Sequence, residues 1–379
     1  MKIAMIGHKR IPSREGGVEI VVEEISTRLA ARGHEVYAYN RKGKYVYGSE
    51  NEYAKIKNYK GVKIIHTPTI PKKGLDALVY SFFAAFHALF QRYDVIHFHA
   101  EGPGVMIRLV RLFGIKTVST IHGLDWKTAK WGGFAKRYLL FGEKTIAKKA
   151  DEVIVLSSNN QKYFLDNYGR NTRFIPNGVN GPENRKPSII TEKYGLQGQD
   201  YLLFLGRIVY GKGLEYLIDA FKQLKTTAKL IIAGGSSHTD EYVEQIRERT
   251  ADDSRIIMTG FIEGQLLDEL FSNCAVYVMP SDSEGMSITL LEAMSYGCTC
   301  LVSDIPENTE VTEDYAVTFK KSNTDDLKEK IELLLKEGFG KYSPEEIRSF
   351  ILKKYNWDDV VDRHLEIYKN IKGEKKGGQ

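Results

Sequence analysis

Short runs of mostly apolar residues recur along the chain, and each is followed by a loop and a stretch with helical spacing. Lys2–Gly7, Asp94–His99 and Tyr201–Leu205 are examples of such runs. Short apolar runs bounded by turn residues are typical of strands that are buried on both faces. Strands that alternate with helices predict parallel sheets joined by right-handed crossovers. The pattern therefore predicts an α/β protein.

The same pattern predicts where the elements lie and where the chain divides. Strands are expected at 2–7, 34–39, 62–66, 94–99, 116–121, 152–156, 173–175, 201–205, 229–235, 255–258, 274–279 and 299–303. Helices are expected at 17–32, 75–90, 102–113, 127–149, 214–224, 287–295 and 357–371. Residues 181–199 are rich in proline, glycine and charge, which is typical of a hinge. We expect one domain over 1–180 and a second over 181–355.

Length and charge agree with two domains of different character. The 379 residues suffice for two substantial cores. Residues 1–180 hold 29 Lys and Arg against 15 Asp and Glu, whereas the remainder holds 25 against 34, so the halves carry +14 and −9. A basic first half predicts an anionic partner, either lipid headgroups or a phosphate-bearing acceptor. Helix-turn-helix, zinc-finger and RRM patterns are missing from the sequence, so we expect no nucleic acid partner.

One stretch, Pro280–Gly297, concentrates candidate chemistry. It predicts a strand that ends before Pro280, a loop that holds Glu284, and a helix that contains Glu292 and ends near Gly297. The free N–H groups at a helix N-terminus attract an anion. Two carboxylates around such a terminus suit a ligand that has both hydroxyls and phosphates, and a nucleotide sugar is such a ligand.

A second glycine-rich loop, Gly206–Gly213, holds Arg207 and Lys212 directly after a predicted strand. Arginine offers a planar fork and lysine a mobile point charge, which together suit a diphosphate. The loop lacks the Gly-Lys-Ser/Thr of a Walker A motif. We therefore expect diphosphate contacts without a Walker-type site.

In the first half, candidate residues follow the predicted strands, because ligands of open α/β sheets bind beyond the carboxyl ends of strands. Gly16 and Gly17 open the first helix and can present N–H groups to a phosphate. Arg10 and Arg14 lie in the basic first loop, where acceptor or phosphate contacts are expected. His99, His122 and Asp125 lie at or just after the ends of predicted strands, and of these His99 and Asp125 are further candidates for acceptor contacts. A structural histidine beneath the loop is the alternative for His99.

The stretch S-E-G-M-S-I-T-L-L-E-A-M-S-Y-G resembles the E-x7-E signature of retaining glycosyltransferases of family 4. Gly206–Gly213 resembles that family's G-R-x-x-x-x-K-G motif, and Pro176–Val179 resembles its P-N-G-V turn. The resemblance implies a GT-B fold, with two Rossmann-like, doubly wound domains facing a cleft. It also implies that the first domain binds acceptor, that the second binds donor, and that the helix over 356–372 packs back on the first domain.

The resemblance also implies roles for single residues. Glu284 and His122 would contact the transferred sugar, and Glu292 would hold the ribose hydroxyls. Glu284, His122, Arg207 and Lys212 would form the catalytic set. The expected donor contacts are Glu292, Arg207, Lys212, Gly16, Gly17, Gly285, Met286 and Ser287. No D-x-D pair lies on a site loop, so neither a metal nor another cofactor is expected beside the nucleotide sugar co-substrate.

The implied reaction moves a hexose to a hydroxyl of a glycan or lipid-linked acceptor in cell-surface polysaccharide or glycoconjugate synthesis. Ile305–Asn308 departs from the Gly-Gly of many relatives, which leaves a UDP-sugar and dTDP-rhamnose open as donors; rhamnosyltransferases of polysaccharide synthesis show a similar departure. A GT-B phosphorylase or epimerase remains an alternative enzyme. A non-catalytic nucleotide-sugar-binding subunit of a membrane assembly remains an alternative outside catalysis.

The expected helix at 127–149 is basic and contains interleaved aromatic residues such as Trp131, Phe134 and Phe141. Such a helix suits docking on an anionic membrane, and the alternative is a solvated face whose aromatics pack inward. Three cysteines in apolar runs and an N-terminal strand too short for a secretory signal predict a cytoplasmic protein. Docking through 127–149 would place it at the inner face of the cell membrane.

Overall fold

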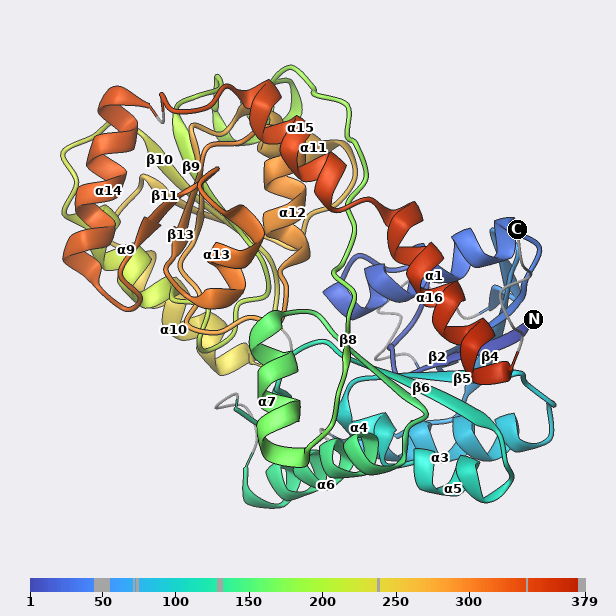
Figure 1. Ribbon diagram of the computed structural model, residues 1–379. Coiled ribbons are helices and arrows are strands. Elements are labelled where there is room, and N and C mark those ends of the chain that lie inside the picture. The colour runs from blue at the N-terminus through green and yellow to red at the C-terminus, as the bar shows by residue number, and fades with distance from the viewer. Residues whose placement is uncertain are drawn as a thin grey trace. The chain divides into compact units, whose positions relative to one another are not determined.

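The computed structural model describes residues 1–43, 55–70, 72, 75–127, 132–236, 239–338 and 340–373. The chain forms two compact units (Figure 1). The first unit combines Met1–Gly178 with the C-terminal residues from Trp357, and the second unit is Val179–Asn356. Both units are parallel α/β structures, which confirms the predicted fold class.

The first unit is built on an eight-stranded sheet with the order β3-β4-β2-β1-β5-β6-β7-β8. Its strands are β1 (Lys2–Ile6), β2 (Glu35–Arg41), β3 (Asn58–Tyr59), β4 (Val62–Thr67), β5 (Val95–His99), β6 (Lys116–Ile121), β7 (Glu152–Val155) and β8 (Arg173–Phe174). All pairs are parallel except β3–β4, which is antiparallel and was not predicted. β1 is central because Ile3 pairs with Val36 on one side and with Val95 on the other.

Helices cover both faces of this sheet. The helical segments are α1 (Gly17–Ala31), α3 (Leu75–Leu89), α4 (Glu101–Gly104), α5 (Ile107–Leu112), η2 (Asp125–Lys127), α6 (Gly133–Lys149), α7 (Ser158–Tyr168) and α16 (Trp357–Lys372). Figure 1 shows α1 and α16 on one face and α3 to α6 on the other. α16 is amphipathic and buries Trp357, Val361 and Tyr368. Arg32, the C-cap residue of α1, also pairs with Asp358 and Asp362 of α16, so the C-terminal helix is held within the first unit.

The second unit has a six-stranded, all-parallel sheet with the order β11-β10-β9-β12-β13-β14. Its strands are β9 (Tyr201–Leu205), β10 (Lys229–Ala233), β11 (Ile256–Gly260), β12 (Val276–Met279), β13 (Cys300–Ser303) and β14 (Val317–Phe319). Its helices are α8 (Ile189–Tyr194), α9 (Leu214–Lys222), α10 (Asp240–Thr250), α11 (Gln265–Asn273), α12 (Ile288–Ser295), α13 (Pro306–Thr312), α14 (Thr324–Glu337) and α15 (Pro344–Lys354).

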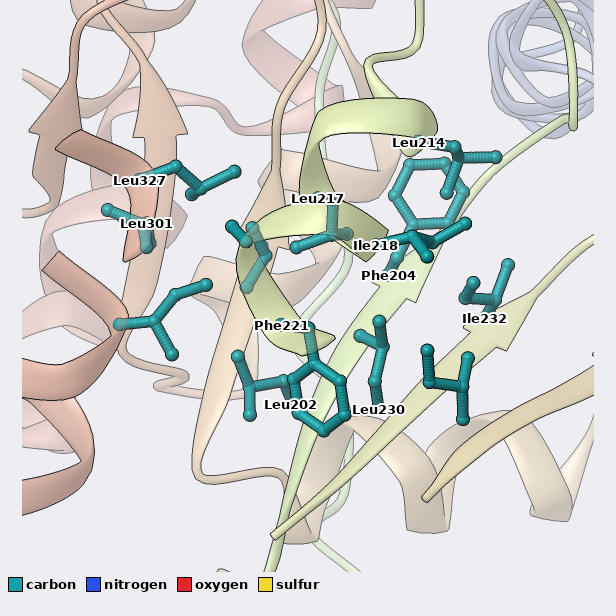
Figure 2. Close-up of a cluster of buried hydrophobic side chains, with 14 of the residues drawn as sticks. Leu202, Phe204, Leu214, Leu217, Ile218, Phe221, Leu230, Ile232, Leu301 and Leu327 are labelled. Atoms are coloured by element: carbon teal, nitrogen blue, oxygen red, sulfur yellow. The ribbon is translucent and has the colours of Figure 1, made fainter. Parts of the chain in front are cut away.

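The core of the second unit fixes the loop between β9 and α9. Figure 2 shows Leu202 and Phe204 of β9 packed with the apolar face of α9, which includes Leu214 and Phe221. Leu214 is fully buried and Phe204 is 2% exposed. Because the residues just before and just after Gly206–Gly213 are both anchored in this core, the short loop has little freedom.

Two predicted helices have different bounds in the structure. The helix expected at 102–113 is divided into α4 and α5. Here α4 packs so closely on α6 that a Cβ on Gly142 would lie 2.0 Å from the carbonyl oxygen of Glu101. The helix α6 begins at Gly133 within the range expected at 127–149, and the extended backbone of Gly132 is its N-cap. Lys130 and Trp131 lie outside the described residues.

The expected hinge contains a helix that the sequence pattern did not reveal. α8 forms because the backbone N–H groups of Ser188 and Ile190 donate to Oε2 of Glu269 at 2.9 and 3.1 Å. Glu269 is buried on α11 and is distant in sequence, so the signal that starts α8 is tertiary.

Candidate active site

Two loops of the second unit leave the carboxyl ends of neighbouring parallel strands. Gly206–Gly213 follows β9 and residues 280–287 follow β12, and these strands pair directly, with Leu202 opposite Val276. The loops touch through their backbones, since the N–H of Asp282 donates to the carbonyl of Gly211 at 2.9 Å. Gly213 has φ of +70°, and a Cβ there would lie 2.1 Å from the carbonyl oxygen of Pro280. The structure therefore joins the two predicted motifs into one surface.

Lys212 and Glu284 form an ion pair across these loops. Their side chains are only 19% and 10% exposed, so the pair is largely shielded from water. The sequence suggested different partners for them, a diphosphate for Lys212 and a sugar for Glu284. A ligand with a phosphate group would compete with Glu284 for the ammonium group and release a carboxylate for other hydrogen bonds.

Arg207 is the other predicted cation of the loop, and it is exposed just after β9. Within the part of the chain that the structure describes, its guanidinium has no hydrogen bond or ion pair. A planar fork with five N–H donors and no protein partner is available to an anion. Arg207 and Lys212 therefore differ, because only Arg207 lacks a protein counter-ion.

The helix after the second loop begins among buried residues and is capped by a side chain. α12 begins at Ile288, one residue after its expected start, and the Ser287 hydroxyl caps it by accepting from the N–H of Leu290 at 3.4 Å. Met286 is 7% exposed and Glu292 is half-buried on the second turn. Gly285 lies directly between Glu284 and Met286. Gly285, Met286 and Ser287 therefore directly precede α12 and Glu292 lies within it, while their contacts with a donor stay predictions.

In the first unit the loop between β1 and α1 is held by its own side chains. His8 Nε2 lies 3.0 Å from Oδ1 of Asn40, and the N–H of Lys9 donates to Glu19 at 2.8 Å. Arg10 is 8% exposed and pairs with Glu15 at 2.9 Å, whereas Arg14 is exposed. The guanidinium of Arg10 is therefore already engaged by a carboxylate.

Gly16 and Gly17 stand at the N-terminus of α1, with Gly16 as the N-cap and Gly17 as the first, exposed helical residue. A Cβ on Gly16 would lie 2.4 Å from Oε2 of Glu19, so a side chain there would require the Glu19 carboxylate to shift. Burial raises the pKa of Glu19, but the N–H and charge of Lys9 outweigh burial and leave that pKa below its usual value. An internal carboxylate therefore already lies close to this helix N-terminus.

Three predicted residues follow β5 and β6. His99 is fully buried, and its Nδ1 lies 3.0 Å from Nε2 of the partly exposed His122. Asp125 lies in η2, and its N–H donates to Oε1 of Glu101 at 3.0 Å. His122 can therefore reach a ligand directly, whereas His99 would act through the ring of His122.

Family models match both halves of the chain. Residues 15–181 match the model described as Glycosyltransferase Family 4, and residues 188–357 match the model described as Glycosyl transferases group 1. The chain is a GT-B glycosyltransferase built from these two domains. An uncharacterized glycosyltransferase of Methanocaldococcus jannaschii is 26% identical, with 97% of this chain and 98% of that protein covered.

Solved structures share the fold of this glycosyltransferase over nearly its whole length. Sucrose-phosphate synthase from Thermosynechococcus elongatus has a TM-score of 0.84 at 23% identity and covers 98% of both chains. The Anabaena protein HepE, solved in complex with UDP-glucose, has a TM-score of 0.80 at 16% identity, with 98% of this chain and 100% of that chain covered. At these identities the likeness shows the fold alone.

Tyr216 of the glycosyltransferase contacts the candidate site, although the sequence did not single it out. Oη of Tyr216 on α9 lies 2.5 Å from the carbonyl oxygen of Pro280 and 2.7 Å from Oδ1 of Asp282. Ser322 donates to the same carboxylate oxygen at 2.7 Å. Burial and the carboxylate of Asp282 raise the pKa of Tyr216, which keeps its hydroxyl a donor. Tyr216 thus fastens α9 to the loop of Glu284, and a tyrosine at a helical position gives no sequence signal for this role.

The segment Ile305–Asn308, which departs from the family pattern, is connected to the loop at residues 280–287 by a series of hydrogen bonds. The buried amide of Asn308 donates to the hydroxyl of Ser303 at 3.0 Å, and this hydroxyl donates to the carbonyl of Ser281. Ile305 is the N-cap of α13 and Pro306 is its first residue. A change in this segment would therefore reach Glu284 through Ser281.

Glu101 is a second residue of the glycosyltransferase that the sequence did not single out. Its side chain is fully buried, beside the backbone N–H of Asp125. Burial, reinforced by the charge of Asp125, raises the pKa of Glu101 well above its usual value. The carboxyl accepts the N–H of Asp125 and so supports the loop of Asp125 from beneath.

Four histidines form a column in the first unit, with His97, His99 and His364 buried and His122 partly exposed. The rings of His97 and His99 stack with centroids 4.2 Å apart, and His99 stacks on His122 at 5.3 Å. His97 also lies 2.7 Å from both Oη of Tyr368 and Oγ1 of Thr120, and its ring is 5.7 Å from that of His364. Burial lowers the pKa of all four histidines. The column links α16 to His122 through neutral rings.

These burials predict a pH dependence of stability. Burial lowers the pKa of His8 and of His364 from 6.5 to about 4 in the folded protein. Between pH 4 and 6.5 the unfolded chain binds more protons than the folded protein. We therefore expect the free energy of unfolding to rise with pH over this range, and the contribution of these histidines to be lost as pH falls from 6.5 to 4. Each histidine contributes roughly 3 kcal/mol over the full range. Urea unfolding measured across this range would check the slope.

His364→Phe should reduce that slope, because it removes one buried group that must gain a proton on unfolding. His87→Gln is the matched control, since His87 is exposed on α3. If both variants kept the slope of the parent protein, the histidine column would not be the source of the acid sensitivity.

No cluster of three His, Cys, Asp or Glu suited to a metal ion occurs among the described residues. Cys274, Cys298 and Cys300 are buried free thiols. None of the helices in the described part of the chain is both long and apolar enough to cross a membrane.

Proposed function

We propose that the glycosyltransferase moves a hexose from a nucleoside diphosphate sugar to an acceptor hydroxyl with retention of the anomeric configuration. The observation that carries this proposal is the joined surface of Gly206–Gly213 and residues 280–287. It offers one unpaired guanidinium, one ammonium group with an exchangeable partner, and a helix N-terminus. These are the groups that stabilise charge on a leaving diphosphate.

UDP-hexose is the donor that we favour, because HepE, which shares the fold, was solved with UDP-glucose. dTDP-rhamnose is the second candidate, and the segment Ile305–Asn308 would select between them through Ser303 and Ser281. We propose a glycan or lipid-linked acceptor in cell-surface polysaccharide or glycoconjugate synthesis.

In this mechanism the bond between the sugar C1 and the phosphate oxygen breaks as a bond forms from the acceptor oxygen to C1. Arg207 and Lys212 bind the diphosphate as its negative charge grows, and Glu292 holds the ribose hydroxyls. Glu284 and His122 orient the sugar. The proton of the acceptor hydroxyl passes to the departing diphosphate oxygen on the same face, so no protein residue is needed as a general base.

Donor binding and turnover would test the proposal in two steps. UDP, UDP-sugars and dTDP-sugars are screened for an increase in melting temperature, which a ligand of the folded state produces. Release of nucleoside diphosphate is then measured with candidate acceptors, with and without EDTA, and the product anomer is assigned by NMR. Retention and EDTA-resistant turnover are expected. An inverted product, phosphate-dependent glycan cleavage, or nucleotide binding without turnover on any acceptor would overturn the proposal.

Glu292→Ala should weaken UDP binding by roughly 2–4 kcal/mol, because ribose hydroxyls would lose a charged hydrogen-bond acceptor. Isothermal titration with UDP measures this loss. Glu329→Ala is the control, since Glu329 is a 76%-exposed glutamate on α14 of the same unit. Equal UDP affinity in Glu292→Ala and the parent protein would place the ribose elsewhere.

A further inference from the structure

The outer face of α3 is an unusually apolar surface. Phe82, Phe83 and Phe86 of α3 are 45%, 44% and 49% exposed, and Phe90, which directly follows the helix, is 69% exposed. The rings contact one another, with centroids 5.6 Å apart for Phe82 and Phe83 and 5.4 Å apart for Phe86 and Phe90. The opposite face of α3 is buried through Tyr80 and small residues. Because α3 is apolar on both faces, its sheet packing leaves one apolar face uncovered.

This apolar face continues over two neighbouring helices. α5 contacts both α3 and α6, and it exposes Leu112 and Phe113, which are 82% and 62% exposed. On α6, Phe134 and Phe141 are 77% and 44% exposed, and the guanidinium of Arg108 on α5 lies 5.5 Å from the ring centroid of Phe141. The aromatic side chains of α6 therefore do not all pack inward. We call the outer faces of α3, α5 and α6 the phenylalanine face (Figure 1).

Exposed charges on the phenylalanine face have one sign. On α6, Phe134, Arg137, Phe141, Lys144 and Lys148 are exposed at helical spacing and share one stripe. The only acids in α3, α5 and α6 are Asp76 and Glu143, and both are buried. Asp76 pairs with Arg41, and Glu143 accepts from Trp126 at 2.8 Å. The partner of this face must therefore be both apolar and negatively charged.

We propose that the phenylalanine face docks the protein on an anionic lipid bilayer. Phenylalanines would enter the acyl boundary while Arg137, Lys144 and Lys148 meet the headgroups, as in interfacial amphipathic helices. α3 has 15 residues, which span about 22 Å, less than a bilayer core, so the helix lies in the interface. A second copy of the chain is a poor partner, because two-fold pairing would set cations against cations. This docking is independent of the proposed transfer reaction.

Vesicle sedimentation of the full chain tests the docking. We expect binding to phosphatidylcholine vesicles that contain phosphatidylglycerol and much weaker binding to phosphatidylcholine alone. The combined change Phe82→Ser, Phe86→Ser and Phe90→Ser should lower the partition coefficient by about 100-fold, because three apolar side chains are removed. Arg137→Glu, Lys144→Glu and Lys148→Glu together should abolish the preference for anionic vesicles and the sensitivity to salt.

Leu333→Ser combined with Lys336→Glu is the matched control, since these exposed residues lie on α14 of the second unit. All variants should keep the melting temperature and UDP affinity of the parent protein, which separates docking from donor binding. Absence of vesicle binding by the parent would overturn the proposal. Equal binding to neutral vesicles, or a dimer that the phenylalanine changes dissociate, would overturn it as well.

Discussion

Arg207→Ala is expected to lower kcat/KM for the nucleotide sugar by roughly 30- to 1,000-fold, or 2–4 kcal/mol of transition-state stabilisation. The physical reason is that Arg207 has no protein partner within the described residues, so its whole hydrogen-bonding capacity can serve the diphosphate. The charge on the diphosphate grows as the sugar leaves, so we expect most of the loss in kcat rather than in KM. Steady-state release of nucleoside diphosphate measures both constants.

A control variant and a stability measurement show whether the effect of Arg207→Ala is specific. Arg247→Ala removes an exposed arginine from α10 of the same unit and should leave both constants unchanged, since Arg247 pairs only with Glu244 on its own helix among the described residues. The free energy of unfolding should be unaffected in either variant, because both side chains are exposed. If Arg207→Ala kept kcat/KM within about twofold of the parent protein, Arg207 would not contact the diphosphate.

Lys212 behaves differently because of its ion pair. Removing the ammonium group leaves Glu284 as a largely buried carboxylate without its partner, and such a change costs stability as well as ligand contacts. Loss of activity in a Lys212 variant would therefore mix two causes, whereas loss of activity in Arg207→Ala has one. For this reason the diphosphate contact is better tested at Arg207.

The local elements of the second unit could be predicted closely from the sequence. The strand at Tyr201–Leu205 and the start of α9 at Leu214 match the predicted positions, because a buried strand and an amphipathic helix each have a clear period. The order of the strands had no such signal. β9 lies next to β12, although β10 and β11 intervene in sequence, and this order brings Lys212 to Glu284.

Buried contacts between distant residues also escaped prediction. The column of His97, His99, His122 and His364 depends on the pairing of β5 with β6 and on the position of α16. Which side of α3 is exposed could not be predicted either, because the sequence of a helix that is apolar on every face does not indicate which face meets the sheet. Assignments of ligand contacts to Glu284, Glu292 and His122 remain predictions from the motif.

Gly213→Ala is expected to cost roughly 2–4 kcal/mol of stability and to abolish most donor turnover. Gly213 has φ of +70°, and a Cβ there would lie 2.1 Å from the Pro280 carbonyl oxygen and 2.4 Å from Oη of Tyr216. Pro280 begins the loop that holds Glu284, so relief of this clash must move that loop away from Lys212. Urea unfolding and calorimetric titration with UDP would measure the two effects.

Gly211→Ala provides a matched control two residues away. Gly211 has φ of +84°, but a Cβ there would meet no atom within 4 Å. The control therefore introduces the backbone strain of a left-handed alanine, about 1 kcal/mol, without any steric clash. A larger loss of both stability and UDP affinity in Gly213→Ala than in Gly211→Ala would show that contact between the two loops forms the donor site. Equal losses would mean that the loops act separately, and the joined surface could not then be the origin of diphosphate binding.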